Sequence, residues 1–158
     1  MTHNFQIKSL QDQEFAHFFE LTNHELDKLG IVRSTVDKKP GYPCRVSLED
    51  AEVGEEVLLL TYQHHKTVSP YQSSGPIFVR KNAVRAMLGI NVVPKMLEHR
   101  LLSIRGYNDS GIMKEASVSE GHDLKDILIK IFHNQEINYV HIHNAKAGCY
   151  NCVAERVY

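Results

Sequence analysis

The stretch HIHNAKAGCYNC, residues 141–152, brings two histidines and two cysteines together near the end of the chain. His141 and His143 are two positions apart, so on a strand both imidazoles lie on one face, with Cβ atoms roughly 6.5–7 Å apart. Two imidazoles at that separation can bind one metal ion. Cys149 and Cys152 add thiols, which act as nucleophiles or as metal ligands. The stretch therefore predicts a site for thiol chemistry or for a metal.

The first hypothesis makes Cys149 a nucleophile. Gly148 precedes it and allows a sharp turn beside the sulfur. His143 would act as general base or as ion-pair partner of the thiolate, with His141 in support. Asn144 would orient the imidazole, because cysteine, histidine and asparagine form a known catalytic combination on unrelated folds. The alternative is an unreactive thiol in a buried turn, which is the commonest environment of a free cysteine.

The second hypothesis is a zinc site. Cys149 and Cys152 have the spacing of a zinc knuckle, and zinc often combines two sulfur ligands with two imidazoles such as those of His141 and His143. His64 is a further candidate ligand. Only five residues separate the histidine pair from the cysteine pair, so the loop would have to be tight. The alternatives are two solvated imidazoles, or a redox dithiol, which usually opens a helix and not a strand. The thiol hypothesis needs no cofactor.

Three arginines in or beside predicted strands indicate an anionic ligand. A charged guanidinium in a half-buried strand needs a partner, because an unpaired buried charge is very unfavourable. The partner is either an internal carboxylate, such as that of Glu49 or Asp50, or a bound anion held by the planar guanidinium. The loop SPYQSSGP could add hydroxyl groups to such a site. The predicted ligand-binding residues are Arg45, Arg80, Arg105, Tyr71, Ser74 and His64.

The hydrophobic pattern predicts one α+β domain over residues 1–158, a mostly antiparallel sheet with helices packed on it as a single pair of layers. Strands are expected over 5–10, 44–50, 55–65, 77–80, 100–107, 112–120, 137–143 and 152–158. Helices are expected over 12–21, 22–29, 81–89 and 122–132, the second opened by a capping box of Thr22 and Glu25.

His64 and His65 end the longest apolar strand, 55–65. Because side chains alternate along a strand, only one of the two should face the same side as Leu60. If this strand were the neighbour of strand 137–143, one of the two histidines would approach His141 and His143.

Composition describes an ordinary globular protein. Of the 158 residues, 42% are hydrophobic and 23% are charged, and the net charge of −1 gives no field that would attract nucleic acid or an anionic membrane. The longest apolar run, VLLL at 57–60, is too short to span a bilayer, and the N-terminal residues lack a signal-peptide pattern. The three cysteines, an odd number, fit a reducing compartment. We therefore expect a cytoplasmic protein.

Three segments resemble a bacterial family known only as a domain of unknown function. They are PGYPCRVSLEDA at 40–51, SPYQSSGPIFVR at 69–80 and HNAKAGCY at 143–150. The resemblance extends over nearly the whole chain and implies a single-domain bacterial protein. It implies no activity, cofactor or mechanism.

Three functions thus stay open. The leading one is a thiol/imidazole enzyme or binder acting on a small anionic ligand. The second is a zinc-binding domain, and the third is a non-catalytic module that binds a small ligand or another protein. The sequence predicts neither a nucleic-acid partner nor a membrane partner, and it leaves the oligomeric state and the question of catalysis open.

Overall fold

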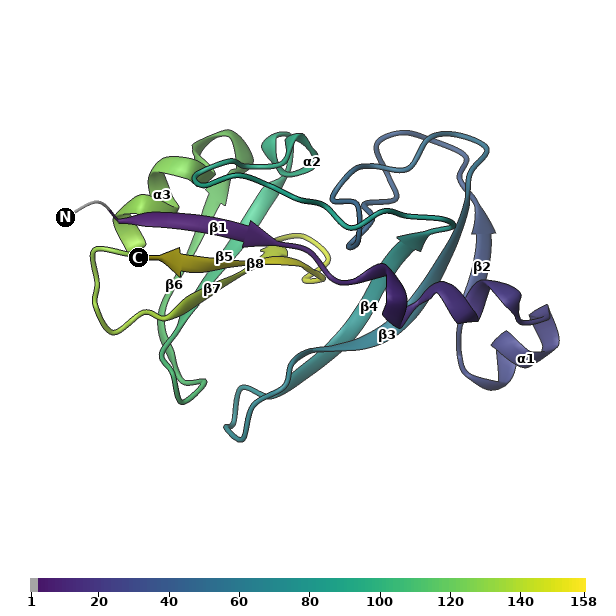
Figure 1. Cartoon of the computed structure of the whole chain (residues 1–158), viewed down its shortest axis with the longest axis horizontal. Helices are drawn as coiled ribbons and strands as arrows, with labels where there is room; N and C mark the ends of the chain where they lie inside the picture. The colour runs from purple at the N-terminus through teal and green to yellow at the C-terminus, as the bar shows by residue number, and fades with distance from the viewer. Residues whose placement is uncertain (1–2) are drawn as a thin grey trace.

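The computed structural model describes residues 3–158 and contains two antiparallel sheets that lie side by side along the long axis of the molecule (Figure 1). The five-stranded sheet has the order β1-β8-β7-β5-β6 and the three-stranded sheet the order β2-β3-β4. The strands are β1 (Asn4–Lys8), β2 (Val32–Thr35), β3 (Glu56–His65), β4 (Ser73–Arg80), β5 (Leu101–Tyr107), β6 (Met113–Glu120), β7 (Tyr139–Asn144) and β8 (Tyr150–Val157). The predicted fold class is confirmed, although the strands divide between two sheets.

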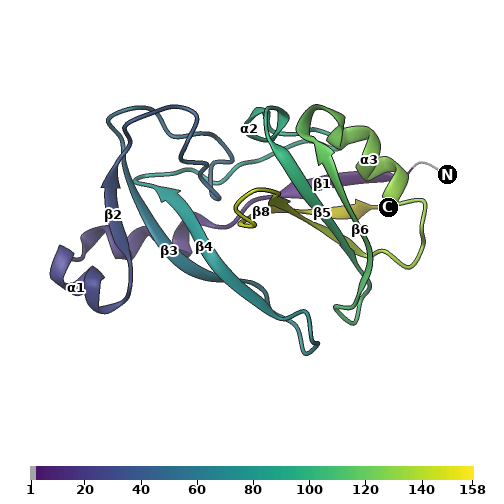
Figure 2. The same ribbon diagram turned by 180° about the vertical axis from the view of Figure 1, so that it is seen from behind.

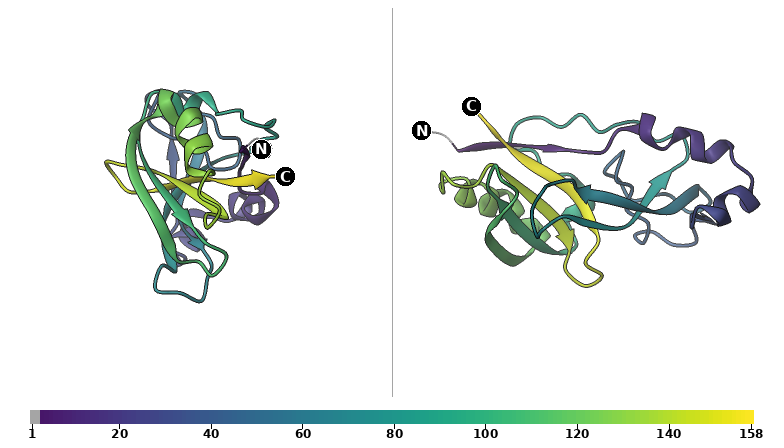
Figure 3. Two further views of the ribbon diagram at one scale, coloured as in Figure 1. Left: turned by 90° about the vertical axis from the view of Figure 1, so that its left-hand side faces the viewer. Right: turned by 90° about the horizontal axis from the view of Figure 1, so that it is seen from below.

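One face of the five-stranded sheet is covered by the helices α2 (Lys95–Glu98) and α3 (Leu124–Ile131), as Figure 1 and the left view of Figure 3 show. The apolar side of α3 packs into the core formed by the strands, because its leucines and isoleucines recur at the helical period. Leu124 and Leu128 are fully buried there, and so are Val140 and Ile142 of β7. Burying one such side chain contributes about 1.5–3 kcal/mol.

The three-stranded sheet has a second core, to which Phe15, Leu58 and Ile77 contribute. Helix α1 (Asn23–Lys28) packs beside this sheet and begins with the predicted capping box, in which the Glu25 backbone N–H donates to Thr22 Oγ1. The predicted helix over 12–21 is instead two short 3₁₀ segments, Asp12–Glu14 and Ala16–Glu20.

Two predicted elements are wrong. Residues 44–50 form turns with isolated bridges and not a strand, and Leu48 has a φ of 54°. Their alternating pattern has another cause: Val46 packs in the second core and Leu48 in the first, so this loop fills the junction between the sheets. Residues 81–89 form no helix: Ala83 packs on the second core and Ala86 and Leu88 on the first, so the segment links the two cores and leaves Val84 and Met87 exposed.

The ends of the β3–β4 and β5–β6 hairpins extend in the same direction and approach each other (Figure 2). Ser69 Oγ donates a hydrogen bond of 2.8 Å to the carbonyl of Gly111 and thus joins the two loops. The C-terminal end of β3 is thereby held opposite β7, although the two strands belong to different sheets. Within residues 3–158, no helix has the length and apolar character that crossing a membrane requires.

Candidate functional site

The two faces of β7 have different environments. Val140 and Ile142 face the core under α3, whereas His141 and His143 point to the other side, as alternation predicts. Both imidazoles are nevertheless buried, with exposed fractions of 5% and 1%. The solvated pair that the sequence left open as an alternative is therefore not what forms.

His64 and His65 of β3 reach these histidines across the space between the sheets. The His64 ring centroid lies 4.9 Å from that of His143 and 6.1 Å from that of His141, and the His65 centroid lies 4.8 Å from that of His141. Alternation predicted that only one of the two would approach. A register shift between Tyr62 and His65 brings both into contact. We call His64, His65, His141 and His143 the histidine cluster.

Tyrosines that the sequence analysis missed surround the cluster. The Tyr150 ring stacks on His64 at 5.1 Å with an interplanar angle of 13°. The Tyr107 ring lies 4.2 Å from His65, and the Tyr139 ring lies 5.4 Å from His141. Alternation alone could have found two of these residues, since Tyr139 shares a strand face with His141, and Tyr107 shares one with Arg105.

His65 is fully hydrogen-bonded. Its Nδ1 donates to the Tyr71 carbonyl at 2.8 Å, so in the neutral ring Nε2 accepts from the Tyr139 hydroxyl at 2.6 Å. The predicted ligand-binding residue Tyr71 thus borders the cluster through its backbone, and its ring lies 6.0 Å from that of Tyr107. Ser74, also predicted to bind ligand, is exposed on β4, and no side-chain hydrogen bond reaches it within residues 3–158.

The other three histidines have nitrogens without partners. His143 Nδ1 donates to the Gly148 carbonyl at 2.9 Å, so in the neutral ring Nε2 carries the lone pair. That Nε2, like Nδ1 of His64 and Nδ1 of His141, is buried and has no hydrogen-bond partner in the described part of the chain. Leaving a buried polar group unpaired costs about 1–3 kcal/mol, so these are nitrogens that an ordered water or a bound ligand would satisfy.

Burial keeps these three rings neutral. It lowers the pKa of His141 to about 2, that of His143 to about 3 and that of His64 to about 4. The positive charge of Arg105 contributes to each decrease, because a second cation is unfavourable beside it. At pH 7 the cluster therefore consists of uncharged donors and acceptors.

Arg105, the charged residue of β5, lies beside these rings. It lies opposite His141 in register, and its Nε donates to Ser103 Oγ at 3.1 Å, which directs the guanidinium toward His143, the residue opposite Ser103. Arg105 is half-buried, and none of the ion pairs formed within residues 3–158 includes it. An unpaired guanidinium beside neutral imidazoles gives a positive site.

The other two predicted arginines lie elsewhere. Arg80 forms a bidentate ion pair with Glu55, with both contacts at 2.9 Å. This pair lies near the end of β3 that is remote from His64. It therefore takes the internal carboxylate that the sequence analysis gave as the alternative. Arg45 is 1% exposed and donates to the carbonyls of Tyr150, at 2.7 Å, and Pro43. Burial lowers the pKa of Arg45 to about 10.

Arg45 helps to fix the turn that carries Cys149. Three consecutive carbonyls of this turn accept hydrogen bonds: that of Gly148 from His143 Nδ1, that of Cys149 from the Asn144 N–H, and that of Tyr150 from Arg45 Nε. Gly148 has a φ of 85°, which a residue with a side chain rarely adopts and which allows the sharp turn that the sequence predicted.

The predicted arrangement of cysteine, histidine and asparagine does not form. Cys149 is half-buried, and no hydrogen bond joins its Sγ to His143 within residues 3–158. The Asn144 side chain accepts from Asn151 Nδ2 at 2.8 Å and so does not orient the His143 ring. The carbonyl of Gly148 orients the His143 ring instead.

Cys152 lies on the opposite face of the sheet from the histidines. An extra residue in β8 places it opposite Ile142, in the core under α3, where it is fully buried. Burial raises its pKa to about 12. A zinc site that joins Cys152 to His141 and His143 is therefore excluded. Within residues 3–158, no three histidine, cysteine or carboxylate side chains have the arrangement of a metal site.

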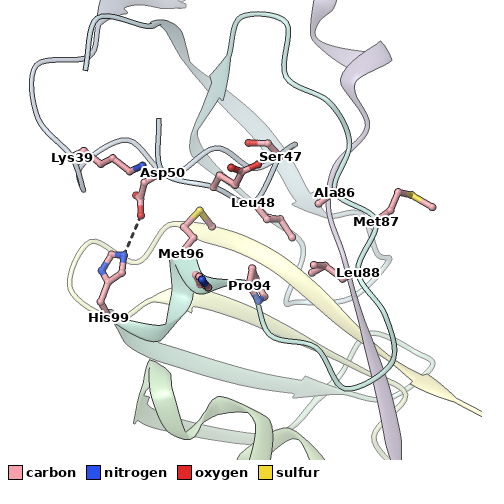
Figure 4. Close-up of a pocket in the computed structure, with 12 residues that line it drawn as sticks. Lys39, Ser47, Leu48, Asp50, Ala86, Met87, Leu88, Pro94, Met96 and His99 are labelled. Carbon is pink, nitrogen blue, oxygen red and sulfur yellow. Dashed lines mark hydrogen bonds and ion pairs between the residues drawn. The ribbon is translucent and has the colours of Figure 1, made fainter. Parts of the chain in front are cut away.

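A cleft of about 570 Å³ opens beside the cluster and is lined by residues that include His64, His65, His141 and Tyr150. Its charged lining residues are Lys66, Glu155 and Arg156, whereas His143 and Arg105 are not among its lining residues. A second pocket of about 560 Å³ lies at the junction of the sheets, where Asp50 contacts His99 at 3.1 Å (Figure 4). Burial acts to raise the pKa of Asp50, but hydrogen bonds and the charge of Arg100 lower it overall. The buried charge in this second pocket is therefore paired, whereas the cluster has unpartnered groups, so we take the cluster as the candidate site.

A family model described as "Protein of unknown function (DUF1203)" matches residues 41–156. This confirms the resemblance to a domain of unknown function that the three sequence segments indicated. No curated protein and no solved structure matches the chain.

Proposed function

The chain belongs to the DUF1203 family of proteins of unknown function, and we propose that it binds a small anion at the histidine cluster. The observation that carries this proposal is Arg105, a half-buried guanidinium that donates to Ser103 Oγ, also interacts with the Tyr107 hydroxyl, and has no carboxylate partner within residues 3–158. A half-buried guanidinium without a carboxylate partner can take a counter-ion from solvent. A bound anion would supply it.

The surrounding groups favour a small, polar anion. Neutral imidazoles present one N–H each, and His64 and His141 have buried Nδ1 atoms without a hydrogen-bond partner within the described residues. The nearby ring of Tyr107 adds a flat aromatic wall beside the cluster. The carboxylates that pair with Arg80 and Arg100 lie at other sites, those of Glu55 and Asp50.

Zinc binding, the alternative from the sequence, is less well supported. The exclusion of Cys152 leaves His141, His143, Cys149 and His64 as the suggested ligands, and within residues 3–158 no three of them have a metal-binding arrangement. Arg105 would also repel a cation at this place. Metal analysis of protein purified without chelator tests this: one zinc ion per chain would contradict the anion proposal.

The cellular setting is part of the same proposal. All three cysteines are free, which supports a reducing cytoplasm. The net charge of −1 favours a small molecule over nucleic acid or an anionic membrane as the partner. Bacterial origin is a further part of the proposal, and the resemblance of the three sequence segments supports it. Cys149, half-buried at the turn after β7, is the residue that could give a bound anion a reaction partner.

The test is calorimetric titration of the protein at pH 7 with inorganic phosphate, sulfate, acetate and glycolate. We expect at least one of these anions to bind, and Arg105→Gln to weaken that binding about tenfold or more, since a hydrogen bond to a charged group contributes about 1.5–3 kcal/mol. Lys125→Gln is the matched control, because it removes a positive charge from the exposed side of α3. Failure of all four anions to bind, or equal losses in both variants, would contradict the proposal.

A further inference from the structure

We infer that the anion bound at the histidine cluster also carries a hydrogen-bond donor, as hydrogen phosphate and 2-hydroxycarboxylates do. This inference rests on the proposed function and specifies its ligand class. It follows from the environment of one atom, Nε2 of His143.

The backbone fixes the tautomer of His143. A carbonyl oxygen only accepts hydrogen bonds, so the 2.9 Å contact between Nδ1 and the Gly148 carbonyl requires the hydrogen to be on Nδ1. Nε2 of the neutral ring is then an acceptor. The Gly148 carbonyl is itself held in place, because the next two carbonyls of the turn accept from the Asn144 N–H and from Arg45 Nε.

No protein donor reaches this acceptor. His143 is 1% exposed, and its Nε2 has no partner among residues 3–158. The nearest side chains on the adjoining strands are Ser103, opposite His143 on β5, and Tyr150, opposite it on β8. The Ser103 hydroxyl, which accepts from Arg105, makes no hydrogen bond to this Nε2, and the Tyr150 ring stands edge-on to His143 at 5.6 Å.

An anion at Arg105 would lie next to this atom. The bond from Arg105 Nε to Ser103 Oγ draws the guanidinium toward the strand position opposite His143. A ligand that bridges the two must offer an anionic oxygen to the guanidinium and an O–H to Nε2. An anion without a proton would instead place an oxygen lone pair against the nitrogen lone pair, which leaves both unpaired.

Two matched pairs of anions test the inference by calorimetric titration at pH 7. Phosphate and sulfate have the same tetrahedral shape, but only phosphate keeps a proton at this pH. Glycolate and acetate differ by one hydroxyl group. We expect phosphate to bind about 10- to 100-fold more tightly than sulfate, or glycolate than acetate by the same factor, which is the range expected for an unpaired buried acceptor.

His143→Gln supplies the matched variant, because its amide can turn to present either an N–H₂ or a carbonyl. We expect the preference within each pair to fall to about twofold, while His133→Gln, at an exposed position after α3, should retain it. If the variant does not fold, the comparison of the anions on the unmodified protein still tests whether the ligand must carry a hydrogen-bond donor.

Equal affinity for both members of each pair would overturn this inference and leave the proposed function standing. So would sulfate binding accompanied by uptake of one proton, measured by titration in buffers of different ionisation enthalpy, because His143 would then be a donor. If none of the four anions bound, the proposed function would fail, and the inference with it.

Discussion

The two faces of β7 are buried to a similar depth, but burial has opposite effects on the stability of the fold. Val140 and Ile142 lose all contact with water against α3, and each of their atoms gains an apolar neighbour. His141 and His143 lose nearly all contact with water too, yet each keeps a ring nitrogen without a partner. The first face stabilises the fold. The second reduces stability, as expected where groups are arranged for a ligand and not for the apoprotein.

The arginines repeat this contrast. Arg80 and Arg100 each meet a carboxylate, and the charges cancel within the protein. Arg105 has the side chains of Ser103 and Tyr107 as neutral partners, and it is the arginine on the polar face of the sheet beside the histidines. The paired arginines join segments of the protein, whereas Arg105, which has no carboxylate partner and lies beside the histidines, is where we propose that an anion binds.

The largest expected effect on the free energy of unfolding comes from substitutions on the two faces of β7. Ile142→Ala should lower the free energy of unfolding by about 2–5 kcal/mol, because it leaves a cavity in the core. His141→Phe should leave the free energy of unfolding unchanged or raise it, since an apolar ring replaces a buried group without a partner, and anion binding should weaken. Urea unfolding monitored by circular dichroism measures both. A loss with His141→Phe as large as that with Ile142→Ala would show that both faces serve stability.

The next largest effect should be a loss of stability in acid, caused by the buried histidines on the second face of β7. His141 and His143 have pKa values of about 2 and 3 in the folded protein against 6.5 unfolded, so below pH 6.5 the unfolded chain binds more protons. Stability is therefore greatest above pH 6.5 and falls as the pH decreases toward 3, by about 1.4 kcal/mol per pH unit for each ring. Urea unfolding at pH 7, 6, 5 and 4 measures this slope.

The matched control for the acid effect is His122→Phe, at an exposed position that should leave the slope unchanged. His141→Phe should reduce the slope by about the share of one ring. If stability were independent of pH between 7 and 4, the imidazoles would have to be accessible to protons in the folded state, contrary to their burial.

The smallest effect concerns the thiols. Cys149 is half-buried, while Cys44 and Cys152 are fully buried. Brief treatment of the native protein with iodoacetamide should therefore label Cys149 first, at least tenfold faster than the other two by peptide mass spectrometry, because alkylation requires access. Saturating phosphate should slow this labelling if the bound anion lies between the cluster and the turn. Labelling of Cys152 at the same rate would contradict its place in the core.

Much of the site could be predicted from the sequence because alternation along a strand is a local property. The spacing of His141 and His143 determined that they share a face, and the pattern of α3 determined which face becomes the core. The capping box of Thr22 and Glu25 and the turn at Gly148 likewise depend on neighbouring residues alone.

Tertiary structure decided which partners these residues have. An extra residue in β8 moved Cys152 to the other face, and a register shift in β3 turned both His64 and His65 toward β7. Whether Arg80 or Arg105 meets a carboxylate depends on contacts between residues far apart in the chain, such as Arg80 with Glu55. The loop 44–50 resembled a strand only because two separate cores draw on alternate residues. Neighbouring residues determine the local structure and chemistry, whereas strand pairing, burial and charge balance arise only when distant segments pack together.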